Sequence, residues 1–403
     1  MSARNDPDKL TVERVNGYGS IAPGFCMKTN RGVGAAIAAV FLSGLGAWAE
    51  SSPQEALYPS GAPGPVMKTL SQIEPRTAIT AAGTVITQPG SYYLASPLSA
   101  TYNVGIKIQS DDVTLDLNGF SLQGGRANGY FGIYVVGVSN APLRNVTIRG
   151  GSISNFDTGL RCDYVQNGCF EQLSISSNLS SGVLFNGAGT GRCSGNVLRA
   201  CAVGKNGSYG VFIHANNGAC EANEVRDCQI FDNATYGIYL AANSGGQGCD
   251  NVIARCAVSG NLSYGVFLTG NGGVCSGNRI EGCTIFGNGS YGVTLSGIGG
   301  RCSGNSLADN CLYQNTTHGI YLNVANNNMI ADNHVSATEA NAGLSFGVNS
   351  ANAASNVVVR NTCSGQISNY VFGATDTYGP VVTNKGALAA SGAAMHPWAN
   401  FSR

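Results

Sequence analysis

The strongest constraint on the fold is a repeat of 27 or 28 residues. The segment "NGSYGV" begins at Asn206 and again at Asn288, and the variants "NATYGI" at Asn233 and "NLSYGV" at Asn261 divide the interval between them. Each unit can be written N-x-h-x-x-C-x-h-x-x-N-x-[S/T]-[Y/H]-G-h-x-h, in which h is an apolar residue. Self-similarity at this period is typical of a solenoid, in which each repeat packs on its neighbours.

The spacing of the apolar residues within the unit predicts strands. These residues lie two apart or at the ends of h-x-x-x-x-h steps, and never at sustained helical spacing. The 57 glycines further disfavour a helical solenoid. Three short strands per turn, each adding one apolar ladder, describe an all-β right-handed parallel β-helix. About ten coils of 27–28 residues would form a rod on the order of 50 Å long.

Two columns of asparagine emerge when the repeats are aligned. We expect both columns at corners, where asparagine tolerates a left-handed backbone and its amide can hydrogen-bond with the copies above and below. The first column holds Asn206, Asn233, Asn261, Asn288 and Asn315, and the second holds Asn196, Asn223, Asn251, Asn278 and Asn305.

Most of the 14 cysteines also fall into two columns, which indicates disulfides if the chain is exported. One column contains Cys193, Cys220, Cys249, Cys275 and Cys302, and the other contains Cys201, Cys228, Cys256, Cys283 and Cys311. Pairing within each coil explains why every coil has one cysteine of each column, and Cys162 with Cys169 would be a sixth bridge. Pairing between coils is the alternative, because neighbours in a column would stand about 4.8 Å apart. The within-coil scheme is preferred because five-membered columns cannot pair off evenly.

Other cysteine roles are weaker. Cys363 falls in an inward apolar column and is expected to be a buried free thiol. No metal site and no cofactor are predicted, because the sequence has no Cys-x-x-Cys and the cysteine columns lack histidine partners.

The start of the chain has the layout of a secretory signal. Lys28 and Arg31 precede an apolar stretch that is too short to span a bilayer, and Ala47-Trp48-Ala49 supplies a small-x-small end. An uncleaved anchor is the alternative. The segments are interpreted as an over-called start (1–26), a signal peptide (27–49), a Pro- and Gly-rich leader (50–75), the β-helix (76–373) and a C-terminal tail or cap (374–403). The mature protein is therefore expected to be secreted, periplasmic or at the cell surface, with no membrane span.

The repeats, together with "GSYYL", "DDVTLDLNGFSL" and "PWANF", resemble the right-handed parallel β-helix repeat of the pectate-lyase-like superfamily. The repeat resemblance covers roughly residues 80 to 373, and the chain also resembles a group of exported bacterial β-helix proteins of unassigned function. It implies the fold but no single activity, because the superfamily includes lyases, hydrolases, epimerases, tailspikes and adhesins.

The catalytic signals are weak. The carboxylate constellation of a polygalacturonase-like hydrolase and the Asp-Pro-His of an epimerase are missing. Asp227 and Arg255 are candidates to meet on neighbouring coils, with Asp309 further along the same outward face, although a surface salt bridge is the simpler interpretation. His318 is a candidate general base, but it also replaces tyrosine in a column of rings. Bound Ca²⁺ would be expected only if the protein is a lyase.

That column of rings is the remaining binding candidate, and it contains Tyr209, Tyr236, Tyr264, Tyr291, His318 and Phe346. Rings that face outward would form a strip able to stack on sugars, whereas rings folded over the corner would pack on one another. Only 11% of residues are charged and the formal net charge is zero, which argues against a nucleic-acid partner. Two hypotheses follow: an exported structural or glycan-contacting protein, or an enzyme acting on acidic polysaccharides. The oligomeric state is not predicted.

Overall fold

The computed structural model describes residues 74–403, apart from residue 102 and the segments 338–345 and 384–391. The expected over-called start (1–26) and signal peptide (27–49), and nearly all of the expected leader (50–75), lie outside the described residues. In the part of the chain that is described, no helix is long and apolar enough to cross a membrane.

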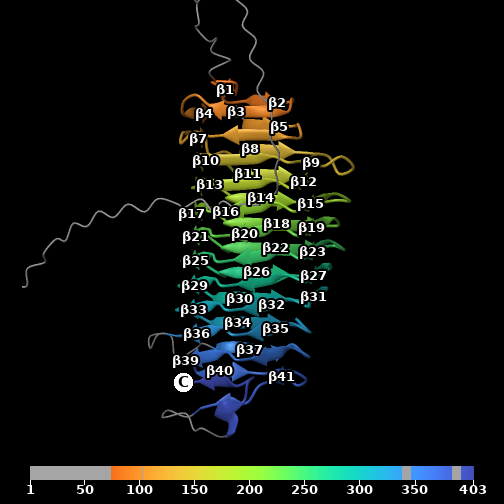
Figure 1. The fold of residues 1–403 in the computed structure, drawn as a ribbon, viewed down its shortest axis with the longest axis vertical. Coiled ribbons are helices and arrows are strands. Elements are labelled where there is room, and N and C mark those ends of the chain that lie inside the picture. Colours follow the sequence, from red (N-terminus) through yellow and green to blue (C-terminus); the bar gives the residue numbers. More distant parts are fainter. Residues whose placement is uncertain (1–73, 102, 338–345, 384–391) are drawn as a thin grey trace, which may run out of the picture. The chain divides into compact units, whose positions relative to one another are not determined.

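The chain winds into a stack of coils whose strands form three parallel sheets (Figure 1). This arrangement confirms the predicted all-β parallel solenoid of about ten turns. A 12-stranded sheet contains β2 (Thr84–Ile86), β5 (Val104–Ile108), β8 (Phe131–Val136), β11 (Thr158–Asp163), β14 (Val183–Asn186), β18 (Val211–Asn216), β22 (Ile238–Asn243), β26 (Val266–Thr269), β30 (Tyr291–Ser296), β34 (His318–Asn323), β37 (Phe346–Asn352) and β40 (Ser368–Val371).

Shorter strands close each coil. A 7-stranded sheet contains β9 (Leu143–Arg144), β12 (Val165–Gln166), β15 (Arg192–Ser194), β19 (Ala219–Glu221), β23 (Gln247–Cys249), β27 (Val274–Ser276) and β31 (Arg301–Ser303).

A 24-stranded sheet forms the rest of the wall. Its first seven strands are β1 (Thr77–Ile79), β3 (Gly90–Leu94), β4 (Leu98–Ala100), β6 (Val113–Asp116), β7 (Ser121–Gly124), β10 (Thr147–Ser154) and β13 (Cys169–Ser176). One arm then continues through β16 (Val197–Arg199), β20 (Glu224–Arg226), β24 (Val252–Ala254), β28 (Arg279–Glu281), β32 (Ser306–Ala308), β35 (Met329–Ala331), β38 (Val357–Val359) and β41 (Thr377–Tyr378). The other arm contains β17 (Ala202–Gly204), β21 (Gln229–Phe231), β25 (Ala257–Ser259), β29 (Thr284–Phe286), β33 (Cys311–Tyr313), β36 (His334–Ser336), β39 (Thr362–Ser364), β42 (Val381–Val382) and β43 (Asn400–Ser402).

The central coils therefore have four strands each, not the three that the spacing of apolar residues predicts. The single strand β13 pairs with both β16 and β17. In the next coil, a corner separates β16 from β17. Ala200 adopts a left-handed conformation at that corner, with φ of 52°. The extra corner breaks one long strand into two short ones.

The core consists of identical apolar positions stacked in register. Ile213, Leu240 and Leu268 are consecutive partners in the 12-stranded sheet, and each is at most 1% exposed. The glycine that follows each column ring has a packing role. A Cβ on Gly210 would lie 2.6 Å from the carbonyl oxygen of Gly237 in the next coil, so glycine is needed for the close approach of neighbouring coils.

The two asparagine columns are buried amide ladders, as expected. Nδ2 of Asn206 donates to Oδ1 of Asn233 at 2.9 Å, and Asn196 makes the same contact with Asn223 at 2.9 Å. The expectation that these asparagines are left-handed is wrong, because the positive φ belongs to the residue before the ladder position, for example Lys205 at 58°. The asparagine instead turns its amide inward, where it bonds to its copies.

The cysteine column of the 7-stranded sheet is shorter than the alignment predicts. Gly248, not Cys249, is the register partner of Cys275. The sulfur of Cys249 lies 3.3 Å from Oγ of Ser276, outside the column. The alignment misplaces Cys249 because it precedes its ladder asparagine by two residues, whereas Cys275 precedes its own by three.

The corner column also loses its last predicted member. Asn310 occupies the column position, since its Oδ1 accepts the backbone N–H of Cys283 at 2.9 Å. Cys311 lies one residue later, in β33, opposite Thr284. The column thus continues as a third asparagine ladder, formed by Asn310, Asn333, Asn361 and Asn400.

The within-coil disulfides are not present. In the structure no cysteine of the described residues is bonded to another, and the two members of a coil lie on different parts of the wall. Cys193 is in β15 of the 7-stranded sheet, whereas Cys201 is at the corner between β16 and β17. This correction applies to all six predicted pairs: Cys162–Cys169, Cys193–Cys201, Cys220–Cys228, Cys249–Cys256, Cys275–Cys283 and Cys302–Cys311. Cys363 is a buried free thiol, as predicted, and burial raises its pKa to about 12.

The C-terminal segment stacks on the last coil. β41 pairs with β38, and β43 pairs with both β39 and β42. A short 3₁₀-helix (Gly392–Met395) precedes β43. Asn400 extends the third asparagine ladder, and the half-exposed ring of Trp398 lies under the Arg360 guanidinium at 5.0 Å.

Candidate functional site

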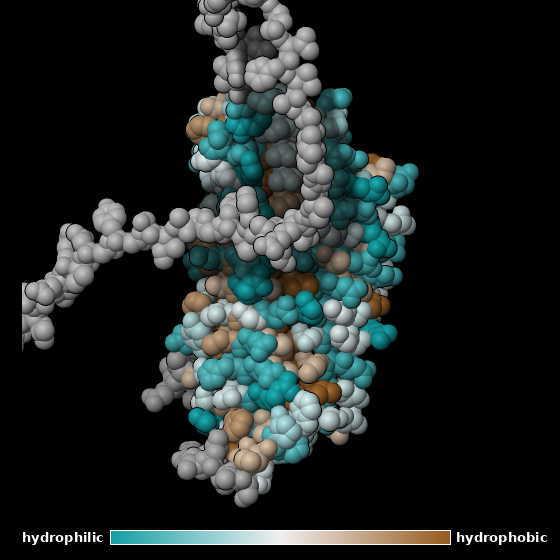
Figure 2. All heavy atoms as spheres, in the orientation of Figure 1, coloured by the Kyte–Doolittle hydropathy of each residue, from teal (hydrophilic) through white to brown (hydrophobic). Residues whose placement is uncertain are grey.

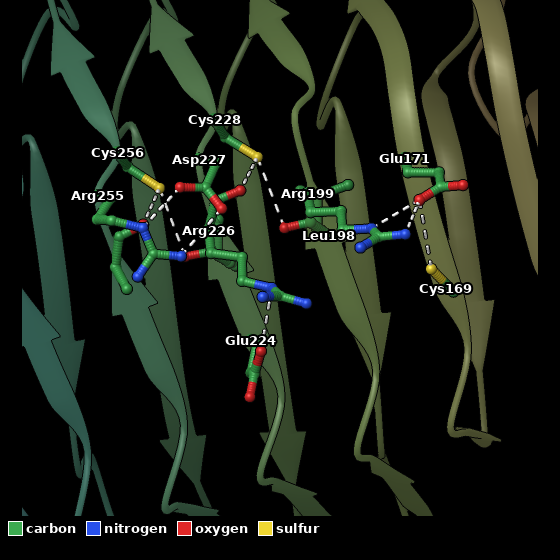
Figure 3. A network of polar contacts seen from close by, with 12 residues as sticks. Cys169, Glu171, Leu198, Arg199, Glu224, Arg226, Asp227, Cys228, Arg255 and Cys256 are labelled. Carbon is green, nitrogen blue, oxygen red and sulfur yellow. Dashed lines mark hydrogen bonds and ion pairs between the residues drawn. The ribbon is translucent and has the colours of Figure 1, made fainter. Parts of the chain in front are cut away.

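The predicted charged candidates form a surface ladder. Arg255 donates to both carboxylate oxygens of Asp227, at 2.7 and 3.0 Å (Figure 3). This hydrogen bonding holds the pKa of Asp227 below its ordinary value. Both residues have left-handed backbones at the outer corner and are about half exposed, and Arg226 pairs separately with Glu224. The geometry is that of a solvated ion pair, which is the simpler of the two interpretations.

The other two catalytic candidates lie on different walls. Asp309 occupies the same left-handed corner of the 24-stranded sheet, whereas His318 begins β34 in the 12-stranded sheet. His318 is 8% exposed and packs between the rings of Tyr291, Tyr321 and Phe346, with centroid separations of 4.8 to 5.1 Å. Burial lowers its pKa. The structure does not bring His318 and Asp309 together.

The predicted aromatic column lies on the outer face of the 12-stranded sheet. Tyr236 and Tyr264 stack at 4.9 Å with an interplanar angle of 10°, and Tyr209 stacks on Tyr236 at 5.5 Å. The four tyrosines of the column are half-buried, so each keeps part of its ring exposed. Packing and outward exposure, treated as alternatives in the sequence, therefore coexist.

A second row of rings lies beside the first and was missed by sequence reasoning. Phe212, Tyr239 and Phe267 are register partners whose rings stack at 5.0 and 5.3 Å. They contact the first row edge-on, for example Tyr264 with Phe267 at 5.1 Å. Together the two rows form an aromatic strip, which consists of Tyr209, Phe212, Tyr236, Tyr239, Tyr264, Phe267, Tyr291 and Tyr321.

At the N-terminal end of this strip the same face carries a cluster of polar residues. Asp163, in β11, is only 5% exposed. Its carboxylate accepts a hydrogen bond from the Tyr134 hydroxyl at 2.6 Å and from Nε of Arg161 at 3.0 Å. The Arg161 guanidinium also lies 4.7 Å from the centroid of the Phe131 ring. These contacts fix the carboxylate and place the guanidinium close to the rings of Phe131 and Tyr134.

A hydrogen-bonded chain connects the carboxylate to a histidine two coils later. Nδ2 of Asn186 donates to Oδ1 of Asp163 at 2.9 Å, which directs the amide oxygen of Asn186 toward Nδ1 of His214 at 3.2 Å. An oxygen at that distance favours the tautomer with a proton on Nδ1 and an unprotonated Nε2. The His214 ring also stacks on Phe212 at 4.8 Å, so it joins the polar cluster to the aromatic strip.

The cluster separates an acid from a base. Burial and the hydrogen bond to Asp163 raise the pKa of Tyr134, so its hydroxyl stays protonated at neutral pH. Burial and the nearby Arg161 charge lower the pKa of His214, so its imidazole is neutral. Such opposed shifts within one site are typical of general acid and base pairs. We call the group of Tyr134, Arg161, Asp163, Asn186 and His214 the polar cluster.

Lys107 extends the positive charge at this end of the face. Its Nζ lies 6.0 Å from the Tyr134 ring, and Lys107 is the register partner of Tyr134 in the coil before. Lys107 and Arg161 therefore flank Tyr134 on the coils before and after it, an arrangement suited to hold a carboxylate group of a ligand.

A signal for the polar cluster does exist in the sequence. Its members occupy the variable positions of the G-h-x-h-x segment in four successive coils, in "GIYVV", "GLRCD", "GVLFN" and "GVFIH". The second aromatic row occupies the same variable position in later coils. Because these positions face outward in a strand, polar and aromatic residues recurring there indicate a shared outer surface.

Known proteins with this fold extend the comparison. The family model described as a right-handed beta helix region matches residues 96–247, 222–302 and 246–387. The A-module of the Azotobacter vinelandii mannuronan C-5 epimerase AlgE4 is similar in structure, with a TM-score of 0.59 and 15% identity over 74% of this chain and 88% of that one. ORF18 of Geobacillus virus E2 has a TM-score of 0.50 and 14% identity, over 69% of this chain and 54% of that one.

No curated protein matches this sequence. The solved structures are too distant in sequence to show more than a common fold. The family model covers well over half of the 403 residues, and the coils and ladders agree with it. The chain therefore belongs to the right-handed β-helix family.

Proposed function

We propose that this protein binds a polysaccharide along the outer face of the 12-stranded sheet, outside the cytoplasm. The observation that carries the proposal is the aromatic strip, in which half-buried rings recur at centroid spacings of 4.8 to 5.5 Å over four coils. An extended chain of sugar rings can stack on such a row while its hydroxyl groups reach neighbouring polar side chains.

The character of the surface favours a carbohydrate over a protein partner. On the side of the molecule shown in Figure 1, the 12-stranded sheet faces the viewer, and Figure 2 shows apolar and hydrophilic residues intermixed on the part of that side that grey atoms do not cover. A protein-binding patch is more often a continuous apolar area with a polar rim. The polar cluster adds hydrogen-bonding groups and positive charge at one end of the strip.

A binding assay with paired variants tests the proposal. A panel of neutral and acidic polysaccharides would be titrated against the full chain and against the double variant Tyr236→Ala/Tyr264→Ala. Loss of two stacking rings should weaken binding about tenfold or more. The matched control is Phe286→Ala/Tyr313→Ala. It removes two stacked rings of the 24-stranded sheet, whose centroids are 4.8 Å apart, and should leave the affinity unchanged. Equal losses in both double variants would contradict a site on the strip.

A second candidate function, acid–base chemistry on an acidic polysaccharide, is favoured by the polar cluster. The neutral imidazole of His214 would accept the proton next to the carboxylate of a uronic acid residue. Arg161 would stabilise the negative charge that develops on that carboxylate. Tyr134 and Lys107 lie three and four coils before His214, so they would contact neighbouring sugars of the same chain. Loss of a general base typically reduces rates by about 10²–10⁴-fold.

Proton exchange measures this activity without assuming the product. The full chain would be incubated with uronic acid polymers in D₂O, and deuterium uptake and new unsaturated ends would be followed. His214→Gln should abolish turnover, whereas His334→Gln, an exposed histidine in β36, should retain it. Because the pKa of His214 is lowered, the acidic limb of the rate profile should lie below pH ~6.5. If the wild type binds polysaccharide but shows no proton exchange, the acid–base function is wrong and only the binding function remains.

A further inference from the structure

Once the register is corrected, the cysteine columns break into runs of even length. At the corner, Cys201, Cys228, Cys256 and Cys283 are consecutive, and the run lies between Leu173 in β13 and Asn310. The four sulfurs are at most 3% exposed. Every member of this run therefore has a neighbour with which to pair.

The inner column behaves in the same way. Cys193 and Cys220 are direct register partners in the 7-stranded sheet, and so are Cys275 and Cys302. Gly248 separates these two pairs, at the position that Cys249 would fill if the repeats had equal length. All four thiols are at most 1% exposed.

The thiols contact one another along each column. Neighbouring thiols in each column are close enough to shift one another's pKa: Cys201 with Cys228, Cys228 with Cys256 and Cys256 with Cys283 at the corner, and Cys193 with Cys220 and Cys275 with Cys302 in the inner column. In-register residues of parallel strands lie about 4.8 Å apart at Cα, within the range of about 4.4–6.8 Å that a disulfide spans. Figure 3 shows Cys228 and Cys256 projecting from equivalent positions of neighbouring coils.

The continuation of the corner column indicates what this position does. In the C-terminal coils it holds Asn310, Asn333, Asn361 and Asn400, whose amides link each coil to the next at 2.9 to 3.2 Å. In the four coils before these, cysteine takes the same place, from Cys201 to Cys283. From Cys201 onward, every coil therefore has at this position a side chain that can join it to its neighbour.

Loss of the Cys228 thiol proton does not leave the Arg226 carbonyl oxygen without a donor. The Cys228 thiol donates to the carbonyl oxygen of Arg226 at 3.2 Å, but that oxygen also accepts the backbone N–H of Ala200 at 3.2 Å. Loss of the weak S–H bond on oxidation is thus tolerated.

We propose that these eight cysteines form four disulfides between neighbouring coils: Cys201–Cys228, Cys256–Cys283, Cys193–Cys220 and Cys275–Cys302. Pairing Cys228 with Cys256 instead would leave both ends of the corner run unpaired. In each step two thiols and one small-molecule disulfide, RSSR, give one protein disulfide and two RSH, so the protein loses two hydrogens and the reagent is reduced. Each bridge closes a loop of one coil and constrains the unfolded chain.

Tryptic mapping of the full chain, refolded with a small-molecule disulfide and blocked with an alkylating agent, tests the pairing. Trypsin places Cys193, Cys201 and Cys228 in separate peptides (193–199, 200–205 and 227–255). We expect 200–205 linked to 227–255 and 193–199 linked to 206–226, and peptide 256–279 linked to both 280–301 and 302–360. A link between 193–199 and 200–205 would overturn the proposal, as would alkylation of all eight cysteines in denaturant without reductant.

A single variant tests whether the two corner bridges form independently of each other. Cys228→Ala should leave Cys201 open to alkylation while the link between 256–279 and 280–301 persists. If Cys201 instead pairs with another cysteine at the same yield as in the wild type, the column does not determine the pairing. The wild-type map keeps the proposal testable even if this variant fails to fold.

Discussion

At the residue scale, the ladder position imposes two requirements on consecutive residues. The residue at the outer corner adopts positive φ, as Asp227 and Arg255 do at 56° and 50°, and the next residue turns its side chain inward to its copies. The charged residues that the sequence offers as catalytic candidates are outer corner residues of this kind. Their recurrence on neighbouring coils reflects corner geometry and ion pairing rather than a site.

His318 illustrates how a buried ring can make stability depend on pH. Its pKa is lowered by burial, so the unfolded chain binds its proton more readily, and stability is lost as pH falls below ~6.5. We expect His318→Phe to reduce this acid-side loss, because phenylalanine has no proton to bind. Urea unfolding between pH 5 and 7 measures the effect. Parallel pH profiles for wild type and variant would show that His318 does not contribute.

At the element scale, the asparagine ladders hold neighbouring coils in register. Oδ1 of Asn233 accepts both the backbone N–H of Asn206, at 3.2 Å, and its Nδ2 at 2.9 Å. Every ladder amide thus satisfies buried donors of the coil before it. A ladder is therefore most sensitive in its middle, where both neighbours depend on the missing group.

Substitution within a ladder should be costly. Asn233→Ala leaves two buried donors of Asn206 without an acceptor, which should lower the free energy of unfolding by about 2–5 kcal/mol. Asn271→Ala, at an exposed position, should change it by about 0.5 kcal/mol or less. Denaturant titration of both variants compares them directly. Similar losses at the two positions would contradict a special role for the ladder.

Register at this scale is where sequence reasoning fails for the cysteines. The aromatic-glycine pairs align correctly, but the glycine-rich links between them differ in length by a residue or two, which hides the displacement of Cys249. Cys311 is displaced for another reason, because it follows ladder Asn305 by six residues, whereas Cys283 follows Asn278 by five. Counting from the ladder asparagines would have exposed the displacement of Cys249, since a buried amide ladder cannot slip by one residue without turning its side chains outward.

At the scale of the whole molecule, the fold was predictable because a solenoid is specified one repeat at a time. Apolar, glycine and asparagine positions recur at a fixed period, and each is dictated by its own coil and its two neighbours. The polar cluster is different, because Tyr134, Asp163, Asn186 and His214 come from four coils and occupy outward positions that the fold leaves free. Only the register between coils shows that these side chains meet.

We propose that the outer face of the 12-stranded sheet is the polysaccharide-binding surface. A crystal structure with the oligosaccharide that binds most tightly in the panel tests it most directly. We expect the sugar chain to run across β18, β22, β26 and β30, with its rings against Tyr236 and Tyr264 and one end near His214. A sugar chain bound to the 24-stranded sheet, with the aromatic strip bare, would contradict the claim.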